Sequence, residues 1–102
     1  MTMRFSLPNF NVVASDEGFS VEILGQTGVK YVEEGKSLFV DSEVLMGPAG
    51  LVVFPESIQA WEPPNDQAVS DRERERIVDN IRRAFRFRGF DIQVVNRQAA
   101  SE

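Results

Sequence analysis

The chain has 102 residues, of which 42% are hydrophobic and 26% are charged, and its formal net charge is −5. This composition is typical of a globular protein, and a chain of this length is expected to bury one core. The sequence contains no cysteine and no histidine, which excludes a disulfide framework and a thiolate zinc site and removes the commonest general base.

Residues 1–17 are predicted to be either a loosely docked arm or a short edge strand. Pro8, Asn9 and Asn11 interrupt any regular pattern, but several apolar side chains between them could dock onto a core. Residues 18–24 then alternate between apolar and polar side chains, and this period of two predicts a half-buried strand.

Residues 29–33 and 37–41 are predicted to form a β-hairpin. One set of alternating side chains is apolar and is expected to face the core: Val29, Tyr31, Leu38 and Val40. Between the two strands, Gly35 suits the left-handed position of a type I turn with a bulge. A second turn is expected at residues 47–50, followed by a buried strand over residues 51–54.

The strongest helical pattern covers residues 71–88. Ser70 and Glu73 have the spacing of a capping box. The apolar residues fall on one stripe, acidic residues dominate the first turn, arginines dominate the last, and Gly89 is placed to end the helix. A last strand is expected over residues 90–94.

These elements predict an α+β fold: a mostly antiparallel sheet of about five strands with one long amphipathic helix packed on one face. Residues 18–95 are expected to form a single domain, and residues 96–102 a disordered tail. The chain start lacks the pattern of a signal peptide, and no apolar run approaches the length of a membrane span. We therefore expect a soluble cytoplasmic protein.

The charges are unevenly distributed along the chain. Residues 1–70 sum to 3 − 10 = −7, and residues 71–102 sum to 8 − 6 = +2. The arginines of the predicted helix alternate with acids at ion-pair spacing, as in Asp79 and Arg83, which favours a solvated helix face over a nucleic-acid site. The net negative charge favours a basic partner, and no nucleic-acid or membrane partner is expected.

No catalytic or metal site is predicted, and no cofactor. Carboxylate pairs such as Asp41 and Glu43 are interpreted as solvated charges at strand ends. Two aromatic residues leave alternatives open: Trp61 is either a core residue or a recognition anchor, and Phe87 either packs at the margin of the core or faces a partner chain. An acidic set near turns and strand ends is the candidate docking patch: Glu33, Glu34, Asp41, Glu43, Glu56, Glu62 and Asp66.

Three stretches resemble a bacterial immunity-protein family, immunity protein 74, found in polymorphic-toxin and contact-dependent inhibition loci. They are residues 31–37 (YVEEGKS) with Gly47 and Pro48, residues 57–64 (SIQAWEPP), and residues 76–81 with 84–89 (RIVDNI and AFRFRG). The resemblance covers roughly residues 18–95. It implies an α+β fold and a cognate toxin domain as partner, often a nuclease.

The function predicted is therefore the neutralisation of a toxin domain by occlusion, without enzymatic activity. The predicted contact residues are Glu33, Glu34, Asp41, Glu43, Trp61 and Glu62. The main alternative is a homodimeric scaffold or adaptor that uses a strand edge and Phe87. A third alternative is an enzyme that works with carboxylates alone.

Overall fold

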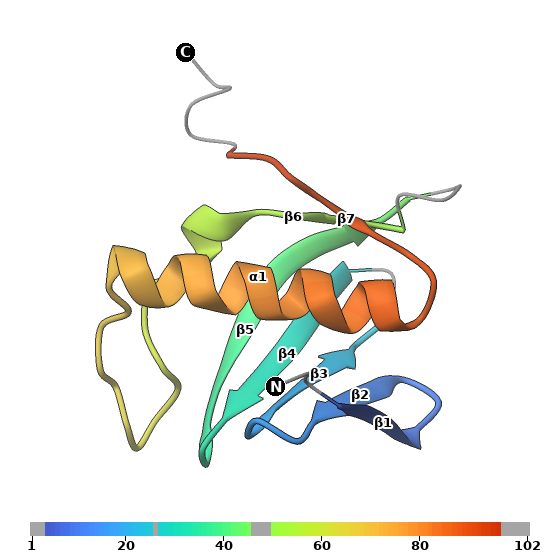
Figure 1. The fold of residues 1–102 in the computed structure, drawn as a ribbon. Helices are drawn as coiled ribbons and strands as arrows, with labels where there is room; N and C mark the ends of the chain where they lie inside the picture. Colours follow the sequence, from blue (N-terminus) through green and yellow to red (C-terminus); the bar gives the residue numbers. More distant parts are fainter. Residues whose placement is uncertain (1–3, 26, 46–49, 97–102) are drawn as a thin grey trace.

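The computed structural model describes residues 4–25, 27–45 and 50–96 (Figure 1). These residues form seven strands in one sheet, one α-helix and one short 3₁₀ helix. The strands are β1 (Phe5–Asn9), β2 (Val12–Ser15), β3 (Phe19–Ile23), β4 (Thr27–Glu33), β5 (Lys36–Val44), β6 (Leu51–Val53) and β7 (Ile92–Val94). The helices are η1 (Pro55–Ser57) and α1 (Asp71–Phe87).

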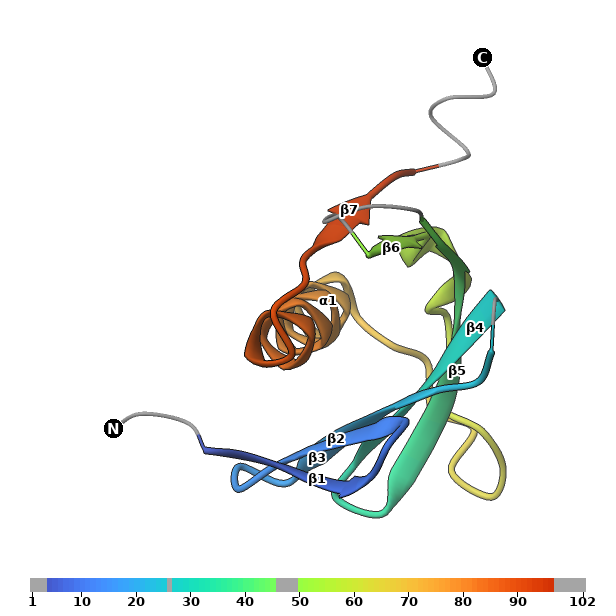
Figure 2. The ribbon, with the colours of Figure 1, turned by 90° about the vertical axis from the view of Figure 1, so that its right-hand side faces the viewer.

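Each strand of the sheet pairs with the next strand in chain order. Every pair is antiparallel except β6 with β7, which is parallel. A parallel pair needs a long connection, and here the chain passes through α1 between the two strands. The sheet curls around α1, so the helix lies in a trough on the concave face (Figure 2). The predicted α+β class, with one helix on one face of a mostly antiparallel sheet, is confirmed.

The sheet has two strands more than the five predicted, because residues 5–15 form a hairpin. β1 is the edge strand and tolerates Pro8, since one side of an edge strand forms no ladder bonds. The hairpin is tied to β3 through its turn. The Ile23 N–H donates to the Asn11 carbonyl at 2.9 Å, and the Asn11 side-chain amide donates to the Ile23 carbonyl at 3.3 Å.

The β4–β5 hairpin supplies the centre of the core. Its predicted inward-facing residues are all buried: Val29, Tyr31, Leu38 and Val40. The turn differs from the prediction, because it contains only Glu34 and Gly35 and both have positive φ, 50° and 80°. Positive φ at both positions is the geometry of a type I′ turn, whose twist matches that of the strands.

The α1 helix begins and ends where the sequence predicts, within one residue. The Ser70 hydroxyl accepts a hydrogen bond from the Glu73 N–H, and the Glu73 carboxylate accepts one from the Ser70 N–H, both at 3.1 Å. Gly89 follows the helix with φ of 85°. The apolar stripe is buried against the sheet: Ile77, Val78, Ile81, Ala84 and Phe85. Burying each of the larger side chains contributes about 1.5–3 kcal/mol.

Two predictions fall largely on residues outside those described. Of the turn expected at residues 47–50, the structure describes only Gly50. Of the tail expected at residues 96–102, it describes only Asn96.

Candidate functional site

Two of the predicted acidic contacts, Asp41 and Glu43, lie on the convex outer face of the sheet. Side chains of a strand alternate between its two faces. On β5 the buried, inward-facing residues are Leu38, Val40 and Ser42, so the outward-facing ones are Phe39, Asp41 and Glu43. Alternate residues of a strand are about 6.5 Å apart, so these three side chains form a row along the strand.

Glu62 joins this row from the proline-rich loop before α1. The Glu62 N–H donates to the Ser37 carbonyl at 2.8 Å, and the Ser37 hydroxyl donates to the Glu62 carboxylate at 2.9 Å. Ser37 is the next outward-facing residue of β5 before Phe39. We call Phe39, Asp41, Glu43 and Glu62 the outer strip. It brings three of the predicted acids together around one aromatic side chain.

Phe39 was not among the predicted contacts, although the alternation of the strand placed it on the polar face. Its side chain is 49% exposed, and Gly28 of β4 explains how it is held. A Cβ atom on Gly28 would lie 2.4 Å from the Phe39 ring, so the ring rests directly on the glycine backbone. Gly28 also has φ of 92° and lies where the register between β4 and β5 shifts, and its N–H donates to the buried Ser42 hydroxyl at 3.0 Å.

The outer strip has polar neighbours across the sheet. Lys30 of β4 pairs in register with Phe39, and Glu22 of β3 pairs with Lys30. The backbone N–H of Asp41 donates to the Ser57 hydroxyl at 2.9 Å, which holds η1 against this part of β5. The face is therefore acidic but mixed, with one half-exposed aromatic ring near its middle.

Glu33 occupies a different environment from the other predicted acids. Its carboxylate accepts bonds from the Arg76 guanidinium at 2.6 and 3.3 Å and from the Tyr31 hydroxyl at 2.7 Å. The Asn80 amide donates to the same hydroxyl at 2.8 Å. Only 14% of the Glu33 side chain is exposed. The carboxylate is thus engaged within the fold, and its role as a partner contact stays a prediction.

The electrostatics of this network follow from burial and pairing. Burial raises the pKa of the Tyr31 hydroxyl far above its ordinary value, and the neighbouring Glu33 carboxylate raises it further, while the Asn80 hydrogen bond opposes the shift. The hydrogen bond to Glu33 raises the pKa of Arg76. Tyr31 therefore stays neutral and Arg76 stays charged, and we call this network of Tyr31, Glu33, Arg76 and Asn80 the brace, because it ties α1 to the sheet.

Trp61 is a core residue, one of the two alternatives that the sequence left open. Its side chain is 2% exposed, and its ring lies 6.3 Å from that of Tyr31 between centroids. The Lys36 ammonium lies 4.7 Å from the Trp61 ring centroid, a cation–π distance. Trp61 thus offers a partner almost no surface. Of the other predicted contacts, Glu34 is exposed in the β4–β5 turn.

Phe87 is half-exposed and packs at the margin of the fold. Its ring lies 5.3 Å from that of Phe5 in the edge strand β1. This contact matches the alternative in which Phe87 packs at the margin of the core.

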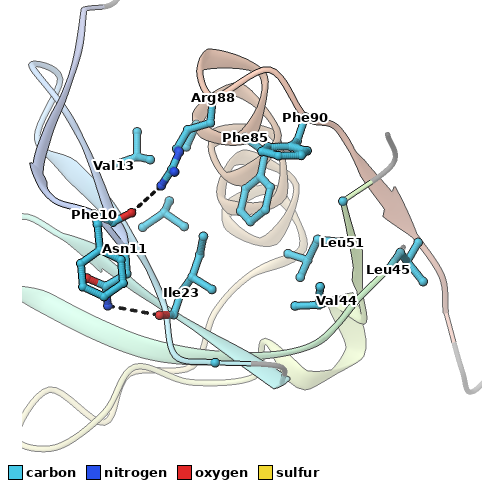
Figure 3. Close-up of a pocket in the computed structure, with 14 residues that line it drawn as sticks. Phe10, Asn11, Val13, Ile23, Val44, Leu45, Leu51, Phe85, Arg88 and Phe90 are labelled. Carbon is cyan, nitrogen blue, oxygen red and sulfur yellow. Dashed lines mark hydrogen bonds between the residues drawn. The ribbon is translucent and has the colours of Figure 1, made fainter. Parts of the chain in front are cut away.

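Two hollows lie at opposite ends of the strands, on the two sides of α1. The charged hollow, of about 520 Å³, lies where β4 ends and β5 begins, and its charged lining includes Glu17, Glu34, Lys36, Arg76, Asp79 and Arg83. The apolar hollow, of about 390 Å³, lies beside the C-terminal end of α1. Figure 3 shows the side chains of this second hollow converging from the sheet, the helix end and the segment after it.

No group of three or more acidic side chains among residues 4–25, 27–45 and 50–96 is arranged to hold a metal ion. None of the helices in these ranges is long and apolar enough to cross a membrane.

Comparison with known proteins yields a family. The model of the family described as Immunity protein 74 matches residues 20–95. This match spans the β4–β5 hairpin, the proline-rich loop and α1. Among curated proteins and among solved structures, the comparisons found no match.

Proposed function

The chain belongs to the immunity protein 74 family, and from this premise we propose that it neutralises a cognate toxin domain by binding and covering it, with no chemistry of its own. Membership of an immunity-protein family implies toxin neutralisation. The kind of toxin, the contact surface and the mode of inhibition are our proposal. We place the encounter in the cytoplasm.

The proposed contact surface is the outer strip, Phe39, Asp41, Glu43 and Glu62. The observation that carries this choice is a half-exposed aromatic ring seated on the Gly28 backbone, with carboxylates beside it on the same strand face. Binding energy at protein interfaces concentrates in a few aromatic or arginine anchors surrounded by polar groups. A ring that is held before binding also loses little conformational entropy on binding.

The proposed partner is basic and of the nuclease type. A nuclease that grips phosphates carries clustered positive charge, and this chain carries a formal net charge of −5. Opposite charges raise the association rate and fix the docking orientation more than they raise affinity. Glu34 lies in the turn that precedes the strip on β5, and we include it as a contact at its margin.

The first test measures association of the purified chain with the toxin domain encoded by the neighbouring gene. We expect Asp41→Lys combined with Glu43→Lys to slow association about tenfold at low salt and to flatten its salt dependence, because steering charges are reversed. The matched control is Glu17→Lys combined with Glu75→Lys, which changes the net charge equally at exposed positions off the strip. Equal slowing by both pairs would assign the effect to net charge and reject the strip.

The second test separates toxin binding from the scaffold alternative. Phe39→Ala should speed dissociation of the toxin complex about thirtyfold, since an anchor residue contributes about 2 kcal/mol. Phe87→Ala is the control, because Phe87 is 47% exposed and lies on α1 away from the strip. A tight dimer in analytical ultracentrifugation that Phe87→Ala disrupts, with no toxin binding, would favour the scaffold.

A further inference from the structure

The apolar hollow is a concave site that the proposed toxin contact does not use. Its inner wall is formed by buried side chains of the sheet and the helix: Val13, Val21, Leu51, Ala84 and Phe85. Phe10, Val44 and Phe90 line it too, and each is at least half or nearly half exposed. A volume of about 390 Å³ falls within the range of small-molecule sites, about 300–1,000 Å³.

Water is a poor occupant for such a hollow. At about 30 Å³ per molecule the space would hold about thirteen waters. An ordered water needs two to four polar partners, and the lining offers few. Replacing these waters by an aliphatic chain removes apolar surface from solvent and is therefore favourable.

The polar groups of the lining indicate one charged end for that chain. Arg88 extends from the end of α1 across the hollow, and its guanidinium donates to the Phe10 carbonyl at 2.6 Å (Figure 3). A guanidinium has five N–H donors, so this bond leaves most of them for a second acceptor. Among the described residues Arg88 forms no salt bridge, whereas Arg82 and Arg86 both pair with Asp91.

The end of the helix does not repel an anion strongly at this place. The Gly89 N–H donates to the Arg86 carbonyl and the Phe90 N–H donates to the Phe85 carbonyl, both at 3.0 Å. These bonds satisfy carbonyls that would otherwise present the negative end of the helix dipole. Arg88 therefore supplies the dominant charge beside the hollow.

We propose that the apolar hollow binds an amphiphile with an aliphatic tail and a single anionic head, the tail lying against Val44 and Phe90 and the head pairing with Arg88. The site is independent of the proposed toxin contact, since it lies on the concave side of the sheet and the outer strip lies on the convex side. The chemistry it recognises is that of a medium-chain carboxylate.

Calorimetric titration of the full chain with decanoate tests the site, with decyltrimethylammonium as the probe of opposite head charge. We expect saturable one-to-one binding of decanoate and at least tenfold weaker binding of the ammonium compound. The comparison is sharp because a chain with net charge −5 would by itself attract the cation. Equal binding of both probes, or no saturable binding of decanoate, would overturn the proposal.

Three variants assign the two halves of the ligand. Arg88→Gln should weaken decanoate about tenfold, while Arg88→Lys, which keeps the charge, should stay within about threefold of the original chain. Ala84→Leu should fill the hollow and weaken both probes at least tenfold. Arg72→Gln, at the other end of α1, is the control and should change nothing.

Folding is checked by thermal melting of each variant. Should Ala84→Leu fail to fold, Val44→Glu replaces it, because Val44 is half-exposed and lines the same hollow. It should weaken decanoate at least tenfold by placing a charged side chain against the aliphatic tail, because Val44 pairs with Leu51 on the inner side of the sheet. Decanoate binding that is unchanged in whichever of Ala84→Leu and Val44→Glu folds would contradict the proposal. A second result would also contradict the proposal. If the original chain did not bind decanoate, and the hollow variants lost toxin capture, the hollow would be assigned to the toxin.

Discussion

Different interactions hold α1 against the sheet at the two ends of the trough. At the charged hollow, Glu33 of β4 is tied to Arg76 of the helix, and Asn80 of the helix donates to Tyr31. These partners are 43 and 49 residues apart in the chain. At the apolar hollow, the side-chain bond between the helix and the first hairpin is that of Arg88 with a backbone carbonyl.

The contrast shows how one helix can be held firmly at one end and leave a site accessible at the other. Directional bonds between side chains fix the register of α1 against the sheet at the charged end. Apolar contacts alone are less directional, and at the other end they leave a space that a ligand could enter. We therefore expect stability to depend on the charged end and ligand binding on the apolar end.

The largest expected effect comes from the core beneath the charged end. Trp61→Ala should lower the free energy of unfolding by about 3–5 kcal/mol, because it removes a buried ring and leaves a cavity. Urea unfolding followed by circular dichroism measures it. Phe10→Ala, at a side chain 88% exposed beside the apolar hollow, should change the same quantity by about 0.5 kcal/mol or less. Similar losses for the two variants would remove the distinction between the ends.

An intermediate effect is expected from breaking the brace itself. Glu33→Ala should cost about 1–3 kcal/mol, because it leaves the buried Tyr31 hydroxyl without one partner and Arg76 without its carboxylate. We place the value below that of a fully buried ion pair, since the Arg76 side chain is partly exposed and solvent screens it.

The matched variant for the brace is Glu33→Gln, which keeps an acceptor for Tyr31 and loses the charge. It should cost less than Glu33→Ala when both are measured by urea unfolding. If the two variants were equally stable, the hydrogen bond to Tyr31 would contribute nothing.

The smallest effect concerns pH and compares two carboxylates at the two ends of α1. The pKa of Glu73 is lowered mainly because the Ser70 N–H donates to it, and that of Asp91 mainly because the Ile92 N–H donates to it, with Arg86 adding to the shift. Each group binds fewer protons in the folded than in the unfolded chain, so stability rises with pH. This contribution is complete above the ordinary values of 4.5 and 3.8 and is lost as pH falls through the folded pKa.

Glu73→Gln combined with Asp91→Asn should therefore flatten the decline of the melting temperature from about pH 5 to about pH 3. Glu75→Gln, at an exposed position of the same helix, is the control. Glu73→Gln and Asp91→Asn, each measured alone, then separate the pH dependence that arises at the helix start from that of the segment after the helix end. A decline as steep as that of the original chain would contradict the assignment.

Much of the fold was predictable because its signals are local. The capping box of Ser70 and Glu73, the apolar stripe of α1 and the alternation of the β4–β5 hairpin each lie within one element, and each was found where predicted. The sequence does not predict two strands in residues 5–15, because Pro8 and the asparagines interrupt the alternation of apolar and polar residues. The position of β1 at the sheet edge, one of the two alternatives expected for residues 1–17, makes Pro8 acceptable.

The candidate site was only partly predictable. Six contact residues are predicted, five acids from their charge and Trp61 as an aromatic anchor. In the structure they lie in different environments. Asp41, Glu43 and Glu62 gather on the outer face, and their role as contacts stays a prediction. Glu33 and Trp61 are engaged in the interior. Phe39 is uncharged and was not predicted as a contact, but it lies on the same face as the acids of the outer strip.

From the sequence alone follow the helix, the strands from β3 onward, their inward-facing side chains, and the family to which the chain belongs. These properties depend on periodicity and on contacts between residues close in the chain. Three features depend on how the chain packs in space: Glu33 pairs with Arg76, Phe39 rests on Gly28, and a hollow opens beside Arg88. The sheet curls around α1 and brings together residues that are far apart in the chain. A pattern confined to neighbouring residues carries no information about such contacts.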